Sequence, residues 1–278
     1  MIDWLSVRRH AGPLVLAACL CAALAACGKK PPLPPPGSVD ADRFLFDRGT
    51  EELKAKHWIA AREYFRRIVD TYPRSEHRPP AKLGIGDSYL GEGRVDSLIL
   101  AANEFREFLT FFPVDRRADY AQYKLGVALS KQVLGPERDQ TATKEALAEL
   151  QKFQQIYPKS QYKPEVDKLY RETRDRLSDS EFLVGQFYFR IRLYAGALSR
   201  LTELLTEDPQ YTRKDQVYFL LGETYFKALL PDQALPYYER LLAEFPASKR
   251  SAEAKKRVAI IKTGKSGANT IPRSFLLR

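Results

Sequence analysis

The chain has 278 residues, and its 45 lysines and arginines against 35 aspartates and glutamates give a formal net charge of +10. Its three cysteines all lie in the first 27 residues, so the rest of the chain has no thiol for a disulfide, a metal site or a nucleophile. Basic residues alternate with acids, as in residues 62–67 and 171–176. This pattern favours solvated helix faces over a nucleic-acid patch and leaves anionic lipid headgroups or an acidic protein surface as partners.

The N-terminus has the parts of an export signal. Arg8 and Arg9 precede an apolar stretch at residues 13–24, which is shorter than the ~20 residues that a membrane span needs. The quartet Leu24-Ala25-Ala26-Cys27 then resembles the lipobox of bacterial lipoproteins. That resemblance implies a signal peptide at residues 1–26 and a lipid-modified Cys27, with Gly28 favouring the outer membrane.

Two alternatives to Cys27 remain. A second quartet ends at Cys19, but cleavage there would leave a very short apolar stretch and a new N-terminus that is still apolar. An ordinary cleaved signal with incidental cysteines is the other alternative. We prefer Cys27 as the anchor, so that residues 27–41 comprise the lipidated cysteine and a Pro-rich tether. At ~3.1 Å per residue, an extended tether over residues 28–41 reaches roughly 40 Å.

The body contains an internal repeat. Each copy is an amphipathic segment that ends in an aromatic or acidic residue, then a proline and a polar turn. The copies occupy residues 64–75, 104–115, 149–160, 200–211 and 237–248. Another amphipathic segment precedes each copy, so the pattern predicts pairs of helices.

Small residues recur at equivalent places in the two helices of each pair, which lets the helices approach closely. They are Gly49/Ala61, Gly86/Ala101, Gly126/Ala146, Gly185/Ala197 and Gly222/Ala234. Larger side chains are expected to fill the space beside them, namely Phe65, Phe105, Leu150, Leu201 and Tyr238.

This repeat resembles the tetratricopeptide repeat, a helix–turn–helix unit of ~34 residues. The resemblance predicts an all-α, right-handed superhelical solenoid of about five units over residues 42–262, followed by a disordered tail at 263–278. The expected units are about 42–76, 79–116, 118–161, 178–212 and 215–249.

The sequence offers little for catalysis. His57 and His77 are the only histidines beyond the signal, and neither has a second histidine at metal-ligand spacing. Gly86-Asp87-Ser88-Tyr89 resembles the nucleophile block of a lipase and esterase family, but no histidine follows His77 to serve as the base for Ser88. We therefore expect no enzyme activity, no metal and no cofactor.

A solenoid of this kind has a concave face lined by the first helix of each unit, and here that face is expected to be aromatic with scattered charges. Such a surface is typical of a peptide-binding groove. An alternative for any one ring is simple packing between units. The predicted groove residues are Phe46, Thr50, Leu53, Lys54, Leu83, Asp87, Leu90 and Tyr123.

Over residues 40–260 the chain resembles the BamD family, the lipoproteins of the outer-membrane β-barrel assembly machine. The most specific matches are residues 138–141, 146–162 and 180–201. Two features depart from the family pattern: Asp208-Pro209 replaces an aromatic-Pro pair, and residues 263–278 have no counterpart. The resemblance implies a non-enzymatic adapter, lipid-anchored to the outer membrane and facing the periplasm.

The resemblance also implies two protein partners. The N-terminal repeats would receive unfolded outer-membrane protein precursors, and the C-terminal repeats would dock a BamA-like, barrel-forming partner. Arg190, Arg192 and Arg200, with the basic stretch 249–262, are the predicted docking residues. The alternative function is another periplasmic tetratricopeptide-repeat adapter, for peptidoglycan or cell division.

Overall fold

The computed structural model describes residues 35, 38 and 40–263. The predicted signal peptide, Cys27, most of the tether and the tail from residue 264 lie outside the described residues. The chain divides into two units at residue 44, and the packing of the repeats lies within the second unit, which begins at Leu45.

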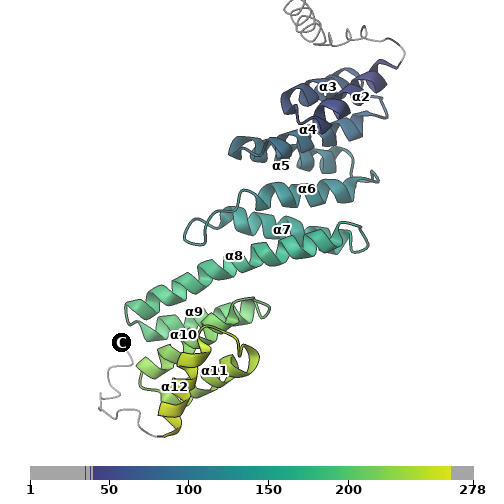
Figure 1. The fold of residues 1–278 in the computed structure, drawn as a ribbon. Coiled ribbons are helices and arrows are strands. Elements are labelled where there is room, and N and C mark those ends of the chain that lie inside the picture. Colours follow the sequence, from purple (N-terminus) through teal and green to yellow (C-terminus); the bar gives the residue numbers. More distant parts are fainter. Residues whose placement is uncertain (1–34, 36–37, 39, 264–278) are drawn as a thin grey trace, which may run out of the picture. The chain divides into compact units, whose positions relative to one another are not determined.

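The described residues contain eleven α-helices and no strand (Figure 1). The helices are α2 (Ala41–Lys54), α3 (Trp58–Thr71), α4 (Arg78–Glu92), α5 (Val95–Phe111), α6 (Ala118–Ser130), α7 (Thr141–Ile156), α8 (Lys163–Arg190), α9 (Tyr194–Glu207), α10 (Lys214–Lys227), α11 (Pro231–Glu244) and α12 (Ser251–Lys262). Each packs mainly against its neighbours in the chain, so the fold is an all-α tetratricopeptide-repeat solenoid.

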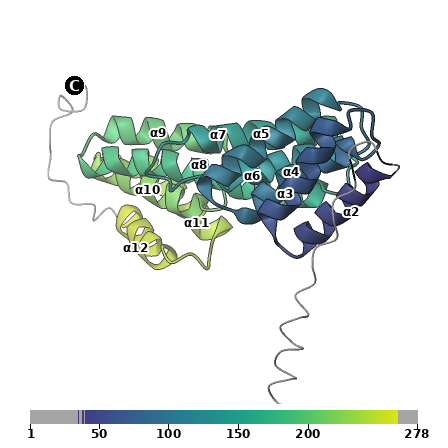
Figure 2. The same ribbon diagram turned by 90° about the horizontal axis from the view of Figure 1, so that it is seen from above.

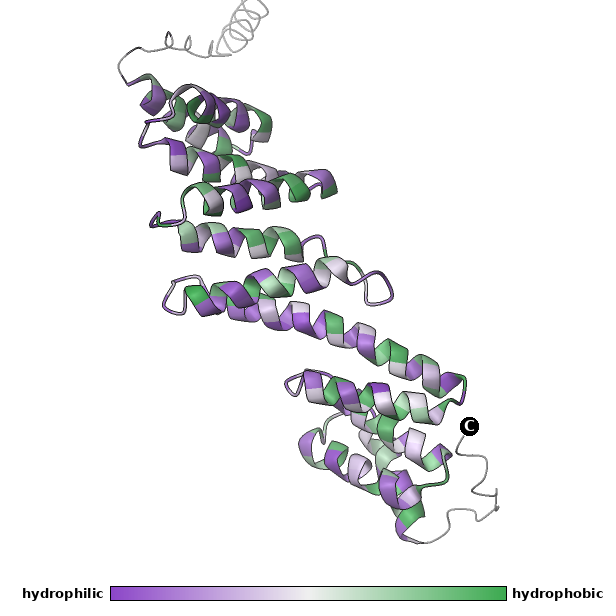
Figure 3. Cartoon of the chain, turned by 180° about the vertical axis from the view of Figure 1, so that it is seen from behind, coloured by the Kyte–Doolittle hydropathy of each residue, from purple (hydrophilic) through white to green (hydrophobic). Residues whose placement is uncertain are grey.

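The helices are amphipathic, so each has an apolar side that packs in the stack and a polar side that faces solvent. Hydrophobic and hydrophilic residues alternate along every helix (Figure 3). Seen from above, α5, α7 and α9 lie along one face of the second unit, with α6, α8 and α10 beside them (Figure 2). Among the residues that the structure describes, no helix has both the length and the apolar character of a membrane span.

The predicted register of small and large residues is confirmed. A Cβ added to Gly49 would lie 2.7 Å from Phe65, and one added to Gly86, Gly126 or Gly222 would meet Phe105, Leu150 or Tyr238 at 2.5–2.8 Å. Gly185 faces Leu201 in the same way. The five alanines of the second helices are fully buried. Close helix approach therefore depends on these positions.

The turn after each second helix has one hydrogen-bond pattern. The residue two places after the proline donates its backbone N–H to the carbonyl of the residue before the proline, as in Ser75 to Tyr72 at 3.0 Å and Ser160 to Tyr157 at 3.1 Å. The Ser160 hydroxyl oxygen also accepts the N–H of Tyr162, at 3.2 Å. A proline followed two residues later by serine, aspartate or, at Tyr211, tyrosine thus ends one unit and begins the next.

One helix runs through the linker between the third and fourth units. Residue 178, the approximate start expected for the fourth unit, lies inside the 28-residue helix α8. The first half of this helix packs on α7 through Val166, and its second half packs near α9 through Phe182 and Phe189. No proline follows Pro164 within the helix, so nothing in the local sequence interrupts it.

Candidate functional site

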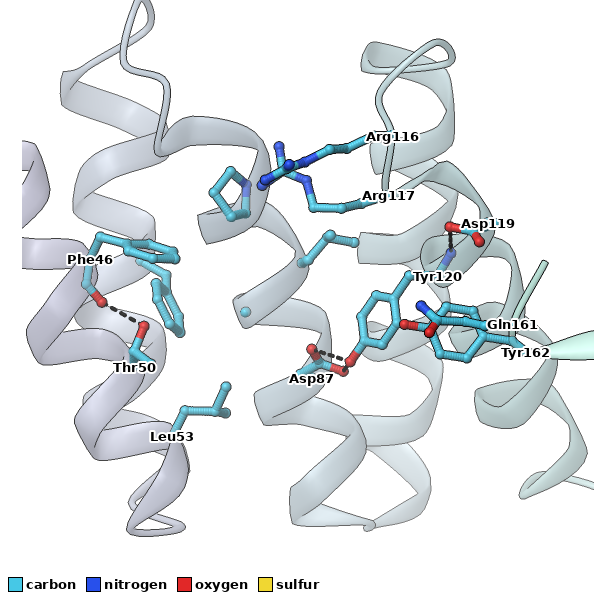
Figure 4. Close-up of a pocket in the computed structure, with 14 residues that line it drawn as sticks. Phe46, Thr50, Leu53, Asp87, Arg116, Arg117, Asp119, Tyr120, Gln161 and Tyr162 are labelled. Atoms are coloured by element: carbon cyan, nitrogen blue, oxygen red, sulfur yellow. Dashed lines mark hydrogen bonds between the residues drawn. The ribbon is translucent and has the colours of Figure 1, made fainter. Parts of the chain in front are cut away.

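A groove of about 350 Å³ lies on the side of the first helices in the first three units (Figure 4). It is built from α2, α3, α4, the turn between α5 and α6, the start of α6 and the turn before α8. Its lining consists of Phe46, Thr50, Leu53, Phe65, Pro80, Leu83, Gly84, Asp87, Arg116, Arg117, Asp119, Tyr120, Gln161 and Tyr162.

One wall of the groove is apolar. Phe46 and Leu53 come from α2 and are half-buried, and the Phe46 ring lies 5.9 Å from the buried Phe65 ring. The Thr50 hydroxyl donates to the Phe46 carbonyl at 2.8 Å, so its hydrogen bond is made within the helix. This wall offers hydrocarbon surface to a ligand side chain.

The opposite wall carries a polar network. Tyr120 donates its hydroxyl to both Asp87 carboxylate oxygens, at 2.9 and 2.8 Å, and the Lys124 ammonium lies 3.5 Å from the same carboxylate. Burial raises the pKa of Asp87, and Lys124 and Tyr120 oppose that rise. Burial, together with the Asp87 charge, raises the pKa of Tyr120. The network holds the Tyr120 ring in place across the groove.

Two arginines lie at the mouth of the groove, and only one of them forms an ion pair with another described residue. Arg117 binds both oxygens of Asp115, at 2.8 Å each, which holds the pKa of that carboxyl below its ordinary value. Arg116 is exposed and its charge also lowers the pKa of Asp115, but it forms no ion pair with any of the described residues. It extends beside Arg117 above the groove (Figure 4). Arg116 is therefore the cation available to an incoming acidic group.

Of the predicted groove residues, the structure brings Phe46, Thr50, Leu53, Leu83 and Asp87 together around this groove. The other three do not line it. Lys54 is exposed at the end of α2, Leu90 packs on the core cluster of the first three units, and Tyr123 stacks on Tyr162 with ring centroids 5.1 Å apart.

The sequence interpretation missed the residues that close the groove. Arg116, Arg117, Gln161 and Tyr162 come from the turns that follow Pro113 and Pro158, whereas the prediction considered only first-helix faces. The repeated proline turn is the signal that would have found them, because it returns the chain to the first-helix side at every unit.

The predicted docking arginines have different surroundings. Arg190 and Arg192 are exposed where α8 turns into α9, near exposed Phe187, Ile191 and Leu193. Arg200 instead lies on α9, beside a cleft that also contains Glu181, Glu203 and Glu207, and it pairs with Glu203 at 3.2 Å. The three arginines therefore do not share one environment, although their spacing in the sequence grouped them.

The residues considered for catalysis make structural contacts in the fold. Ser88 is fully buried in α4 and donates its hydroxyl to the Ile85 carbonyl at 2.7 Å. His57 contacts Glu52 at 2.7 Å, and the His77 ring stacks on Phe46. Within residues 35, 38 and 40–263, no group of three histidines, cysteines or acids is placed to hold a metal ion.

The chain is similar in sequence to proteins named as outer-membrane assembly factors. The chain is 27% identical over 195 residues to "Outer membrane protein assembly factor BamD" of Caulobacter vibrioides, covering 69% of this chain and 61% of that protein. It is 23% identical over 170 residues to the protein of the same name from Vibrio cholerae, covering 58% of this chain and 69% of that protein. The chain thus spans about 61% of the length of the Caulobacter relative.

Among solved structures, the chain is similar to the TPR2AB domain of yeast Sti1 in its complex with pHSP90. The TM-score is 0.46 at 13% identity, and the match covers 81% of this chain and 84% of that one. A family model described as "YfiO: Outer membrane lipoprotein" matches residues 40–234. Since this match extends over more than half of the sequence, the chain belongs to the YfiO family of outer membrane lipoproteins.

Proposed function

We propose that this protein is a non-enzymatic adapter in the assembly of outer-membrane β-barrel proteins. Its groove holds segments of unfolded precursors, and its last two units dock a BamA-like partner that forms the barrel. The relatives named as BamD assembly factors support the assembly role. The observation that carries the proposal is the groove. In it an apolar wall faces a polar network and the exposed Arg116, which forms no ion pair with the described residues.

Precursors of β-barrels expose alternating apolar and polar side chains before they insert. The apolar wall of Phe46, Leu53 and Phe65 suits the apolar residues of such a segment. Arg116 at the mouth suits an acidic residue or a carboxylate of the same segment. A groove of about 350 Å³ holds a few side chains without enclosing the whole segment, which fits a protein that must release its client.

The turn between α8 and α9 is the proposed docking surface for the barrel-forming partner. Phe187, Ile191 and Leu193 are each about half exposed there, at 48%, 47% and 52%. Arg190 and Arg192 flank them and form no ion pair with other described residues. Aromatic and arginine side chains beside aliphatic ones are the usual anchors of protein interfaces.

We further propose that a lipid on Cys27 anchors the protein to the outer membrane, with the repeats facing the periplasm. The lipobox quartet supports this step, and Cys27 lies outside the described residues. The alternative adapter, for peptidoglycan or cell division, would use the same groove and the same anchor. The partner that co-purifies with the protein distinguishes the two functions.

The experiment is site-specific photo-crosslinking in cells. A photoreactive residue at Phe46 or Leu53 is expected to capture outer-membrane protein precursors, whereas one at Glu63, exposed on α3, is not. Affinity purification of the full chain is expected to retrieve a β-barrel membrane protein. Equal labelling from both faces, or retrieval of cell-division proteins alone, would contradict the proposal.

A further inference from the structure

A second cleft adjoins the groove. It occupies about 530 Å³ between the α5–α6 turn and the α7–α8 turn. Its lining consists of Asp115, Arg116, Asp119, Ile156, Tyr157, Pro158, Lys159 and Ser160. Arg116 and Asp119 also line the groove, so the two hollows have one wall in common.

The acidic residues of this cleft have partners within the protein, whereas its basic residues form no ion pair with the residues that the structure describes. Asp115 is bound by Arg117, and Asp119 accepts the Ser160 hydroxyl at 2.7 Å and the Tyr120 N–H at 2.7 Å. Arg116 and Lys159 are exposed and form no ion pair with other described residues. The acids are therefore occupied within the protein, while the two cations are available to a ligand.

The cleft also presents apolar surface. Ile156 is 53% exposed beside Tyr157 and Pro158. Phe111, at the end of α5, and Val114, in the α5–α6 turn, are also exposed, at 64% and 97%, but they do not line the cleft. The apolar surface of the cleft itself comes from Ile156, Tyr157 and Pro158.

We propose that the groove and this second cleft form one continuous site for an extended segment with two apolar side chains and an acidic side chain between them. This inference rests on the proposed precursor binding and adds its specificity. One apolar side chain contacts the wall of Phe46 and Leu53, and the other contacts Ile156 and Tyr157. Arg116, on the shared wall, pairs with the acidic side chain, and Lys159 adds charge at the far end.

An extended segment suits this geometry because its alternate residues point to one side. Residues i, i+2 and i+4 of a strand face the same way at ~6.6 Å per pair of residues. A segment of the form apolar-x-acidic-x-apolar therefore presents all three contacts on one side. A helix would turn the middle residue away from the shared wall.

The test measures binding of short fluorescein-labelled synthetic peptides to the full chain by anisotropy. One peptide has a single Phe, and a second series adds an acidic residue and a second Phe two, four or six residues away. At least one two-anchor peptide is expected to bind about tenfold more tightly than the single-anchor peptide, because a second apolar side chain is buried. Ile156→Asp and Arg116→Glu are each expected to remove most of that gain.

Matched variants keep the test specific. Ile59→Asp changes another exposed isoleucine, on α3, and Lys227→Glu changes an exposed lysine at the end of α10; neither is expected to alter peptide affinity. If the single-anchor peptide binds and no second anchor improves it, the continuous site is wrong while the proposed function stands. If no peptide binds, the proposed function fails. A dimer in sedimentation that Ile156→Asp dissolves would show that a second copy occupies the cleft, which would also overturn the inference.

Discussion

The guanidinium of Arg171 on α8 binds both carboxylate oxygens of Asp208, at 2.8 and 2.5 Å. Asp208 is only 3% exposed and also accepts the Ser178 hydroxyl at 2.6 Å. The corresponding position at the end of the other second helices holds an aromatic residue, namely Tyr72, Phe112, Tyr157 or Phe245. The long α8 thus supplies a buried ion pair where the other units use a ring.

The first prediction is that Asp208→Ala lowers the free energy of unfolding by about 1–3 kcal/mol, because Arg171 and Ser178 lose their buried acceptor while Arg171 keeps its pair with Asp175 at 2.8 Å. Chemical denaturation near neutral pH measures the change. Glu203→Ala removes the exposed pair with Arg200 and is expected to cost less than ~1 kcal/mol. Similar losses for both variants would show that the Asp208 pair has no special weight.

The second prediction concerns acid. Hydrogen bonds from Arg171 and Ser178 hold the pKa of Asp208 below its ordinary value of 3.8, against the effect of burial. The folded state therefore binds this proton less readily than the unfolded state. The stability that it adds is complete above the ordinary pKa and is lost as the pH falls through the folded value.

Asp208→Asn removes this titration without changing the side-chain size much. The difference in unfolding free energy between wild type and Asp208→Asn should be constant from about pH 7 to about pH 5 and should shrink toward about pH 2. Other carboxylates titrate in both proteins and cancel in the difference. A difference that stays constant down to about pH 2 would contradict the lowered pKa.

The third prediction concerns the close approach of α2 and α4 to one ring. A Cβ added to Gly84 would lie 2.4 Å from the Phe65 ring, which also faces Gly49 on its other side. Overpacking costs about 1–3 kcal/mol, while alanine gains about 1 kcal/mol of helix propensity. Gly84→Ala should therefore destabilise by up to about 2 kcal/mol and, because Phe65 lines the groove, weaken peptide binding.

Gly135→Ala is the matched control. Its added Cβ would meet only the Glu137 carboxylate, the end of a flexible side chain that can move away. Thermal unfolding should show a lowered melting temperature for Gly84→Ala and little change for Gly135→Ala. Equal shifts would mean that the Gly84 contact does not set the helix spacing.

The fourth prediction concerns the turns inside the units. Four of these turns place one residue at positive φ: Lys56 at 61°, Gly93 at 71°, Arg192 at 62° and Leu229 at 62°. Only Gly93 lacks the Cβ that makes this conformation costly. Gly93→Ala should lose about 1 kcal/mol of stability, and Lys56→Gly, at an exposed site, should gain up to about 1 kcal/mol.

Scanning calorimetry checks the pair of variants. A change of about 1 kcal/mol corresponds to roughly 2–4 °C in Tm for a domain of this size. The two substitutions should move Tm in opposite directions. If both lower Tm, the left-handed conformation is not the source of strain at Lys56.

The fifth prediction tests the docking surface. Phe187→Asp with Arg192→Glu should lower the affinity for the barrel-forming partner at least about tenfold, because an aromatic anchor and its neighbouring charge are lost together. The melting temperature should hardly change, since both side chains are exposed. Ile59→Asp with Lys56→Glu alters the equivalent turn of the first unit and should leave partner retrieval intact. Loss with both double variants would indicate a general effect of charge.

The amino-acid sequence by itself determined the period, the pairing of helices and the contacts within each pair. Gly49 with Phe65 and Gly222 with Tyr238 were predictable because close packing inside a hairpin depends on residues at a short, regular spacing. The proline turns were predictable because proline and the residues after it determine a turn locally. Most of the first-helix groove residues followed from that register.

Only the tertiary structure decided what depends on the stacking of separate units. Phe46 and Tyr162 line one groove although 116 positions separate them, and the prediction left out Arg116 and Tyr162 because they lie in turns. Arg171 and Ser178, both on the long helix α8, meet Asp208 at the end of α9, although 37 and 30 positions separate them from it. Local patterns determine which residues face a neighbour, but the geometry of the stack determines which neighbour they meet.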